Sequence, residues 1–130
     1  MKIKPYLYVR ESKGKGRGVF TKEAINKGIL IEEAPVLVLS DKDTVKALKT
    51  HLYNYLFDWS GKHRSCVALG WASLYNHSYT PNCAGEFDFK KKVMKIKTIR
   101  KIEKGEELFI NYNGAAEDES PLWFKVKKQR

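Results

Sequence analysis

Short apolar runs separated by turn residues constrain the fold of this chain more than any other feature. Runs rich in β-branched and aromatic residues are typical of strands, and glycine, asparagine and proline end such runs. They predict strands over 6–9, 18–21, 29–33, 36–39, 65–69, 85–89, 93–99 and 108–112. The KKK stretch at 90–92 predicts a hairpin, and Pro35 predicts a break between two strands. The sequence therefore predicts a mostly β domain.

One helix is predicted, from about Thr44 to Trp59, with Asp43 as its cap. The evidence is a set of apolar residues at helical spacing: Val45, Leu48, Leu52, Tyr55, Leu56 and Trp59. No internal repeat or linker divides the chain. Its 130 residues are enough for one domain with its own core.

Composition excludes several classes of protein. Hydrophobic residues make up 42% of the chain, more than a disordered chain would have. No apolar run reaches the ~18 residues of a membrane span, and the first residues lack the apolar stretch of a secretory signal. Two cysteines, Cys66 and Cys83, are too few for a disulfide framework or a four-cysteine zinc cluster. We therefore expect an intracellular protein without membrane contact or bound metal.

The formal net charge of +10 suggests an anionic partner, although charge alone predicts only non-specific attraction. Basic residues gather in two clusters: Lys90, Lys91, Lys92, Lys95, Lys97, Arg100 and Lys101, then Lys125, Lys127, Lys128 and Arg130. Acidic residues between the clusters would suit a cationic substrate, or are simply solvated loop charges. Weak contact with nucleic acid through the basic clusters is one expectation.

Alternate glycines mark the stretch GKGRGVF (14–20), where the backbone is able to approach a ligand closely. A dinucleotide fingerprint or a phosphate loop would need a helix after the glycines. The residues after Gly18 favour a strand instead. Taken alone, this stretch favours a hairpin turn.

The stretch LYNHSYTPNC (74–83) collects residue types that serve in many sites. His77 and Cys83 are its only metal-ligand types, and a zinc site needs three or four ligands. A cysteine nucleophile would need the histidine within hydrogen-bond reach, which the spacing does not specify. A bend made of turn formers fits better locally. EELFINY (106–112), which ends a predicted strand on Tyr112, would alone be interpreted as the edge of the core.

In this order and spacing, the three motifs resemble those of the SET-domain protein lysine methyltransferases. GRGVF matches the N-terminal glycine motif of that family, LYNHSYTPNC matches its central motif, and GEELFINY matches its C-terminal motif with the tyrosine. The resemblance runs from about Gly14 to Gly114. It is greatest to the minimal SET proteins of large DNA viruses, which similarly carry YLF (here 55–57) and ALG (here 68–70).

The resemblance implies a β-clip-like SET fold with several short curled sheets, one longer helix and a C-terminal pseudoknot. It implies a catalytic SET domain over residues 1–114, with a variable helical insert at about 41–64. Residues 115–130 would form a tail segment that completes the lysine channel.

The implied activity is S-adenosylmethionine-dependent methyl transfer to the ε-amine of a lysine in a protein, such as a histone tail. Tyr112 is the implied catalytic residue, beside the transferred methyl group. The residues implied to bind the cofactor are Gly16, Arg17, Gly18, Asn76, His77, Tyr112 and Trp123. Those implied to bind the substrate are Tyr55, Tyr75, Ile110 and Phe124. Tyr55 and Tyr75 would suit ordinary core packing equally well.

Departures from the family pattern refine these expectations. The cysteine-rich zinc-binding segments of many relatives are missing, so zinc is not implied, and Asn111 stands where relatives often have Asp. Ile110 and Gly85 stand where relatives place aromatic residues that restrict methylation, so we expect a dimethyl or trimethyl product. The likeness to viral proteins implies a homodimer.

Two alternatives stay open at this point: a basic nucleic-acid-binding module, and a cofactor-binding SET module that has lost turnover. The location expected is the cytoplasm if the protein is bacterial and the host nucleus if it is viral.

Overall fold

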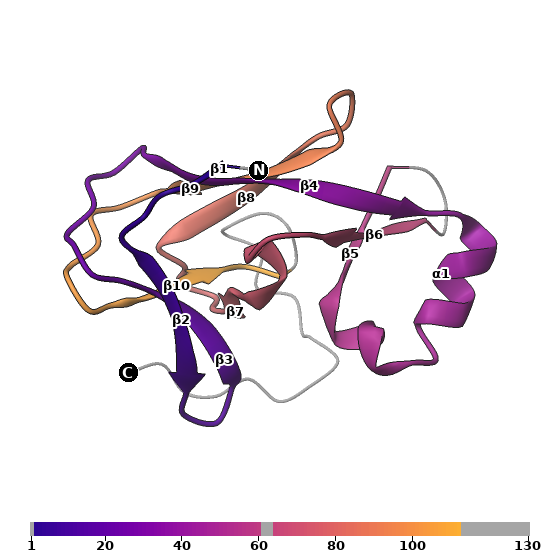
Figure 1. Ribbon diagram of the computed structural model, residues 1–130, viewed down its shortest axis with the longest axis horizontal. Coiled ribbons are helices and arrows are strands. Elements are labelled where there is room, and N and C mark those ends of the chain that lie inside the picture. The colour runs from indigo at the N-terminus through magenta and orange to yellow at the C-terminus, as the bar shows by residue number, and fades with distance from the viewer. Residues whose placement is uncertain (1, 61–63, 113–130) are drawn as a thin grey trace.

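The computed structural model describes residues 2–60 and 64–112, which form two β-sheets and three short helices (Figure 1). The larger sheet contains β1 (Lys2–Ile3), β4 (Leu30–Leu39), β5 (Leu56–Asp58), β6 (Ser65–Ala68), β8 (Cys83–Asp88) and β9 (Val93–Thr98). The smaller sheet contains β2 (Leu7–Ser12), β3 (Gly16–Thr21), β7 (Asn76–His77) and β10 (Glu107–Ile110). The helices are α1 (Asp41–Ala47) and the 3₁₀ helices η1 (His51–Tyr55) and η2 (Ala72–Leu74).

The order of strands is β5-β6-β4-β9-β8 in the larger sheet, with β1 beside β4, and β2-β3-β10-β7 in the smaller sheet. One apolar core joins the two sheets. Its members include Val19 and Leu108 from the smaller sheet and Ile31 and Ile96 from the larger one, all at most 1% exposed. The predicted mostly β class, with curled sheets and a single α-helix among the described residues, is confirmed.

The predicted hairpin at KKK is confirmed, because β8 and β9 pair antiparallel from Cys83 opposite Thr98 to Asp88 opposite Val93. The carboxylate of Asp88 accepts the backbone N–H of Lys91 at 2.9 Å. Such a bond from an aspartate to its own backbone is typical of turns.

Pro35 does not end a strand, contrary to the prediction, because β4 continues through it. The strand changes its main partner at this point. Residues up to Pro35 pair with β9, and residues from Val36 onward pair with β6. A proline is tolerated where a ladder of hydrogen bonds ends, since its missing N–H leaves no neighbour unpaired there.

The predicted helix at 44–59 is wrong in its second half. The helix α1 begins after Ser40, whose Oγ accepts the N–H of Asp43 at 3.1 Å, and it ends at Ala47. The hydroxyl of Thr50 then donates to the carbonyl of Ala47 at 2.7 Å and accepts the N–H of Leu52 at 3.1 Å. Such local side-chain bonds compete with a continuing helix. The end of the predicted helix pairs with β6 as strand β5, so tertiary pairing overrides the local pattern.

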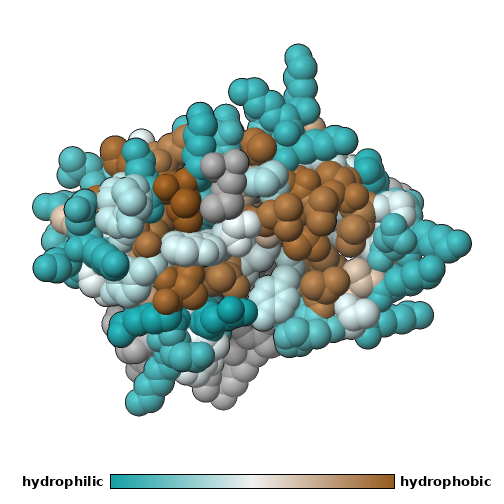
Figure 2. Space-filling model, in the orientation of Figure 1, coloured by the Kyte–Doolittle hydropathy of each residue, from teal (hydrophilic) through white to brown (hydrophobic). Residues whose placement is uncertain are grey.

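The apolar residues that predicted this helix are therefore mostly not core residues. Val45 is 52% exposed, and Leu48 and Leu52 are each 46% exposed, whereas Trp59 is buried. Figure 2 shows apolar surface on the side of the molecule that carries α1 and η1. Within the described ranges, no helix is long and apolar enough to cross a membrane.

The described part ends shortly after β10. The predicted pseudoknot and the predicted tail over 115–130 therefore extend outside the described residues.

Candidate active site

Strand β10 brings the three sequence motifs together, because it lies between β3 and β7. Leu108 of β10 pairs antiparallel with Val19 of β3. Ile110 of β10 pairs parallel with His77 of β7. The glycine motif, the central motif and the C-terminal motif therefore meet in one small sheet (Figure 1).

The carboxylate of Glu107, on β10, bonds to side chains of β2 and β7. Its Oε1 accepts the hydroxyl of Ser12 at 2.6 Å, and its Oε2 accepts Nδ2 of Asn76 at 2.6 Å. Nδ2 of Asn76 also donates to the carbonyl of Arg17 at 3.2 Å, so the side-chain amide of Asn76 is bonded to two strands. A Cβ at Gly18 would collide with the Glu107 carboxylate and lie 2.8 Å from Nδ2 of Asn76. Only glycine leaves room for this packing at position 18.

Gly16 meets a different physical need. Nothing lies within 4 Å of the point that its Cβ would occupy, but its φ is +75°, an angle that other residues rarely adopt. Gly16 also closes the hairpin between β2 and β3, opposite Ser12. The hairpin interpretation of this stretch is thus confirmed, and position 16 keeps its backbone open to a ligand.

His77 is buried and neutral at physiological pH. Its Nδ1 accepts the backbone N–H of Tyr112 at 3.0 Å, so this nitrogen carries no proton. Burial, with the charge of Lys15 as a smaller cause, lowers the pKa of the imidazole to about 4. The ring proton is therefore on Nε2, a buried atom with no hydrogen-bond partner among the described residues. Such a donor calls for an acceptor from a ligand or from water.

The hydroxyl of Tyr112 donates to the carbonyl of Tyr75 at 2.6 Å. Burial, and to a smaller extent the charges of Glu107 and Tyr55, raises the pKa of this phenol. Tyr112 is therefore neutral at physiological pH. Because its hydrogen is donated to a carbonyl, its oxygen is suited to accept a bond from a substrate amine and is not suited to act as a base.

A cavity of about 120 Å³ lies against Tyr112. It is lined by Asn54, Tyr55, Leu56, Phe57, Asp58, Ser73 and Tyr112. Polar and apolar groups both line it, and the exposed Asp58 adds one negative charge. Such walls suit an aliphatic chain that ends in an amine.

The structure brings most of the predicted site residues together. Gly16, Arg17, Gly18, Asn76 and His77 lie on the strands beside β10, and Tyr112 follows its end.

Of the residues predicted to bind the substrate, Tyr55 lines the cavity. Tyr75 and Ile110 are 0% and 2% exposed and belong to the core, so they do not line it. Trp123 and Phe124 lie outside the described residues.

Sequence reasoning missed Glu107 and Asn82, which are both buried polar side chains. The amide of Asn82 donates to the carbonyl of Glu107 at 2.9 Å and accepts the N–H of Phe109 at 2.8 Å. It thus holds β10 by its backbone. The local pattern indicates only a bend at Asn82 and only a loop charge at Glu107. One feature of the sequence could have indicated them: Asn82 lies in the central motif and Glu107 lies in the C-terminal motif.

The bend predicted within 74–83 is confirmed, because the hydroxyl of Ser78 accepts the N–H of Thr80 at 2.9 Å. Burial raises the pKa of the Cys83 thiol to about 12, so this residue is not a thiolate nucleophile at neutral pH. Within 2–60 and 64–112, no three potential metal-ligand side chains gather.

Known proteins share this sequence and this arrangement. The SET domain family matches residues 16–113. A histone-lysine N-methyltransferase of Schizosaccharomyces pombe, described as H3 lysine-37 specific, is 34% identical over 124 residues, which cover 95% of this chain and 80% of that protein.

Two solved structures share the fold. A candidate histone methyltransferase of Plasmodium falciparum has a TM-score of 0.68 and 31% identity, over 85% of this chain and 95% of that one. A humanized mutant of the Chaetomium thermophilum Polycomb Repressive Complex 2 has a TM-score of 0.70 over 85% of this chain and 15% of that one. Its 23% identity shows the fold alone.

The family match spans the glycine motif, the central motif and the C-terminal motif, which the structure places around one strand. The relative from Schizosaccharomyces pombe is similar over almost the whole chain. The chain therefore belongs to the SET domain family.

Proposed function

We propose that this SET domain protein transfers methyl groups from S-adenosylmethionine to the ε-amine of a lysine in a basic protein segment, with histone tails as the substrate class. The family and the relative from Schizosaccharomyces pombe show the enzyme class, a protein-lysine methyltransferase. The methyl donor, the substrate and the product state are what we propose. The observation that carries the proposal is the neutral Tyr112 hydroxyl, held 2.6 Å from the carbonyl of Tyr75 beside the cavity.

The residues around β10 fit S-adenosylmethionine. His77 offers a buried Nε2 donor that has no partner in the described part of the chain. Gly16 leaves open space where a side chain would stand. Nδ2 of Asn76 already donates to Glu107 and Arg17, so the side-chain oxygen of Asn76 is the group that we propose for the cofactor. When bound, S-adenosylmethionine supplies an electrophilic methyl group on a sulfonium.

The protein must present the substrate lysine as a neutral amine. A free lysine has a pKa near 10.4, which is about 3.4 units above pH 7. Its deprotonation at pH 7 therefore costs roughly 4–5 kcal/mol. Removal of the amine from bulk water as it enters the cavity disfavours the charged form and lowers this cost. The oxygen of Tyr112 then accepts an N–H of the amine and so directs its lone pair. The proton leaves to solvent as the amine enters, without a protein base.

The charge of Asp58 acts earlier, when the protonated lysine approaches. Asp58 is exposed and lines the same cavity. An exposed carboxylate attracts a cationic segment at long range and is screened by salt. This supports a basic substrate segment, of which histone tails are an example.

We further propose a dimethyl or trimethyl product. Ile110 has no hydroxyl that could hold a water in the cavity. Gly85 has no side chain, and a Cβ at this position would lie only 2.5 Å from Cε of Met94. The hydroxyl of Ser73 is donated to the carbonyl of Ala68 at 3.0 Å. Tyr55 is therefore the residue whose hydroxyl would hold an obstructing water if the product were limited to one methyl group.

Mass spectrometry of methylated peptides tests the proposal. The full chain is incubated with S-adenosylmethionine and peptides that tile the histone tails, with lysine-to-arginine peptides as the matched control. We expect methyl groups on one lysine, and none without the donor. Transfer only to non-histone proteins of a cell extract would overturn the substrate class. Calorimetric binding of the donor without transfer to any protein would instead favour a SET module that has lost turnover.

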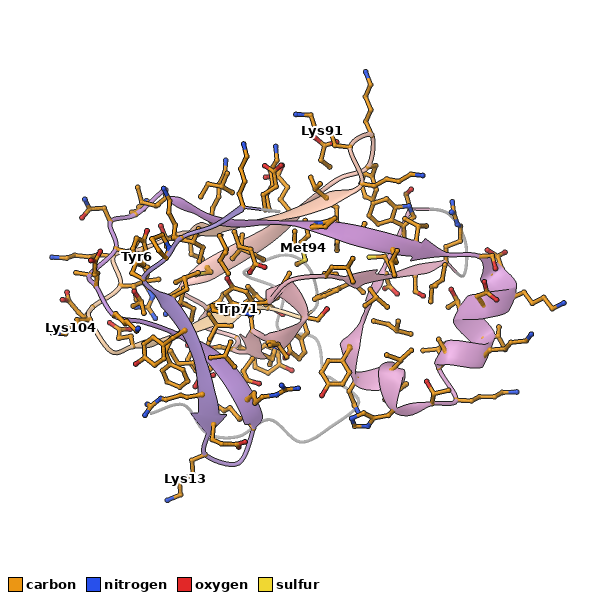
Figure 3. All side chains as sticks on the ribbon, in the orientation of Figure 1. Tyr6, Lys13, Trp71, Lys91, Met94 and Lys104 are labelled. Carbon is orange, nitrogen blue, oxygen red and sulfur yellow. The ribbon has the colours of Figure 1, made fainter. Side chains whose placement is uncertain are left out.

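The β8–β9 hairpin supports a second candidate function, contact with nucleic acid. Phe89 is 51% exposed and lies next to Lys90, Lys91 and Lys92, which are exposed as well. Figure 3 shows Lys91 at the tip of this hairpin, away from the body of the molecule. Lysines beside an exposed aromatic ring suit a nucleic-acid strand. Binding of a fluorescent oligonucleotide should weaken as salt rises, and binding that ignores salt would exclude this contact.

The homodimer is a separate proposal. The exposed apolar side chains of Val45, Leu48 and Leu52 support it, since a second copy would remove them from water. Light scattering at high protein concentration tests it, and a monomer mass would exclude it.

A further inference from the structure

A carboxylate is buried in the middle of the larger sheet, on strand β4, which carries none of the three sequence motifs. Glu32 of β4 is 1% exposed, and it pairs with Ile96 of β9 and with Ile3 of β1. Burial of a carboxylate among apolar side chains is costly unless its oxygens are hydrogen-bonded. The bonds that Glu32 makes therefore indicate what the structure gains from it.

Both oxygens of Glu32 bond to one short segment, residues 71–75. Oε2 accepts the backbone N–H of Trp71 at 2.8 Å. Oε1 accepts the hydroxyl of Tyr75 at 2.9 Å. Figure 3 shows Trp71 in the middle of the molecule, where η2 begins. A single side chain thus holds the start of η2 and the residue that follows its end.

The same segment carries two groups of the active site. The carbonyl of Tyr75 is the acceptor of the Tyr112 hydroxyl, at 2.6 Å. Ser73, inside η2, lines the cavity beside Tyr112. Any shift of residues 71–75 would therefore move the acceptor that orients Tyr112 and one wall of the cavity together.

We infer that Glu32 is a positioning residue for methyl transfer: its carboxylate fixes η2 and the ring of Tyr75, and so holds the Tyr75 carbonyl where it orients the Tyr112 hydroxyl. This inference rests on the proposed role of Tyr112. Glu32 itself touches neither substrate nor cofactor. It acts through two hydrogen-bonded steps, from Glu32 to Tyr75 and from Tyr75 to Tyr112.

The chemistry of the carboxylate explains why glutamate suits this position. An ionised carboxylate only accepts hydrogen bonds, and here the backbone N–H of Trp71 and the phenol of Tyr75 donate to it. Glutamine would keep the size and one accepting oxygen, but its amide N–H groups would face either the phenol or the backbone donor. One of the bonds would have to reverse or break. Glu32→Gln is therefore a small change in shape and a specific change in the bonds.

The test measures methyl transfer from the donor to the substrate peptide by Glu32→Gln and by the wild type. The rate is expressed per folded site, and folded sites are counted by S-adenosylmethionine binding. We expect kcat to fall tenfold or more, while the Kd for the donor and the KM for the peptide stay within threefold. Glu33→Gln is the matched control, because Glu33 is the next residue of the same strand and is only half-buried. Tyr75→Phe, which keeps the ring and the carbonyl, should lower kcat as Glu32→Gln does.

A purely structural role predicts a different result. It would lower the melting temperature and the number of folded sites, with kcat per folded site within threefold of the wild type, and this outcome would overturn the inference. If Glu32→Gln does not fold, Tyr75→Phe decides the question by the same criterion. Loss of folding in both variants would also overturn the inference.

A second measurement does not depend on turnover. The ¹³Cζ resonance of Tyr112, assigned by its loss in Tyr112→Phe, reports the hydrogen bond of its phenol. We expect it to move in Glu32→Gln and to stay in place in Glu33→Gln. If Tyr112→Phe keeps full turnover, the proposed role of Tyr112 fails. If Tyr112→Phe loses turnover and Glu32→Gln keeps both turnover and resonance, only the inference about Glu32 fails.

Discussion

The backbone N–H of Tyr112 donates a hydrogen bond to Nδ1 of His77 at 3.0 Å, which joins the predicted catalytic residue to the middle of the central motif. The bond requires an unprotonated Nδ1, and burial lowers the pKa of this imidazole to about 4. Protonation of His77 would therefore break the bond and place a charge in the core. The position of Tyr112 thus depends on a neutral histidine.

Stability should fall in mild acid because of His77. Its pKa is lowered from 6.5 to about 4 by folding, so below pH 6.5 the unfolded chain binds the proton more tightly than the folded chain does. The free energy of unfolding therefore decreases as the pH falls below 6.5. We expect a loss of roughly 1.5 kcal/mol between pH 6.5 and pH 5 from this group alone. Urea unfolding across this range measures it. The loss should be absent in His77→Gln and present in His51→Gln, which changes an exposed histidine. An unchanged slope in His77→Gln would contradict the assignment.

The hydroxyl of Tyr112 should matter for turnover and not for cofactor binding. Tyr112→Phe removes the group that is fixed by the Tyr75 carbonyl, so kcat should fall by about a hundredfold or more. The Kd for S-adenosylmethionine should stay within a few-fold, as calorimetry can show. Tyr8→Phe is the control, since Tyr8 stacks on Phe20 in the β2–β3 pair. Turnover near the wild-type rate in Tyr112→Phe would remove Tyr112 from the mechanism.

The two glycines of GRG should fail differently when they are replaced. Gly18→Ala forces a methyl group against Glu107 and Asn76, so it should cost about 2 kcal/mol of unfolding free energy and weaken donor binding. Gly16→Ala and Gly105→Ala share a positive φ and open space, so each should cost about 1 kcal/mol from backbone strain. Of these two variants, only Gly16→Ala should also weaken donor binding. Thermal unfolding and calorimetry of the three variants separate these effects.

The charge of Asp58 should assist capture of a basic substrate. Asp58→Asn should raise the KM for a basic peptide by about two- to fivefold at low salt and by less at high salt, with kcat nearly unchanged. Asp41→Asn removes an equally exposed charge at the start of α1 and should leave KM unchanged. Equal effects in the two variants would mean that only the net charge matters.

The hydroxyl of Tyr55, which lines the cavity, should not limit the product state. Peptide driven to completion should carry two or three methyl groups with the wild type and with Tyr55→Phe. A product that stalls at one methyl group in the wild type and proceeds further in Tyr55→Phe would show that the Tyr55 hydroxyl limits the cavity. Ile110→Tyr is a less clean test, because Ile110 is 2% exposed and a larger side chain there would disturb the core. Mass spectrometry of the intact peptide gives the result.

Much of this protein follows from the sequence because the signals are local. Strand formers alternate with turn residues, so the strands and the β8–β9 hairpin were predicted close to their observed places. The order of the glycine, central and tyrosine motifs indicated the family, and the structure gathers residues of these motifs, such as Gly18 and His77, in the small sheet around β10.

The errors arose where distant partners decide the outcome. Apolar spacing predicted a helix through Tyr55 and Trp59, but β6 offered a partner to Leu56–Asp58, and a paired strand replaced the last turns. Pro35 predicted a break, yet β4 changes partners at that residue and keeps its direction. Local propensity is a weak guide when long-range pairing competes with it.

The sequence by itself indicated which residues we propose for the chemistry: the glycines, His77 and Tyr112. Only the tertiary structure decided how they are held. In the fold, Glu107 accepts a hydrogen bond from Asn76, His77 accepts one from the N–H of Tyr112, and Glu32 accepts one from the hydroxyl of Tyr75. The physical reason is that burial and hydrogen bonding between distant residues set the charge and the direction of a group, and neither property is written in the local pattern of the chain.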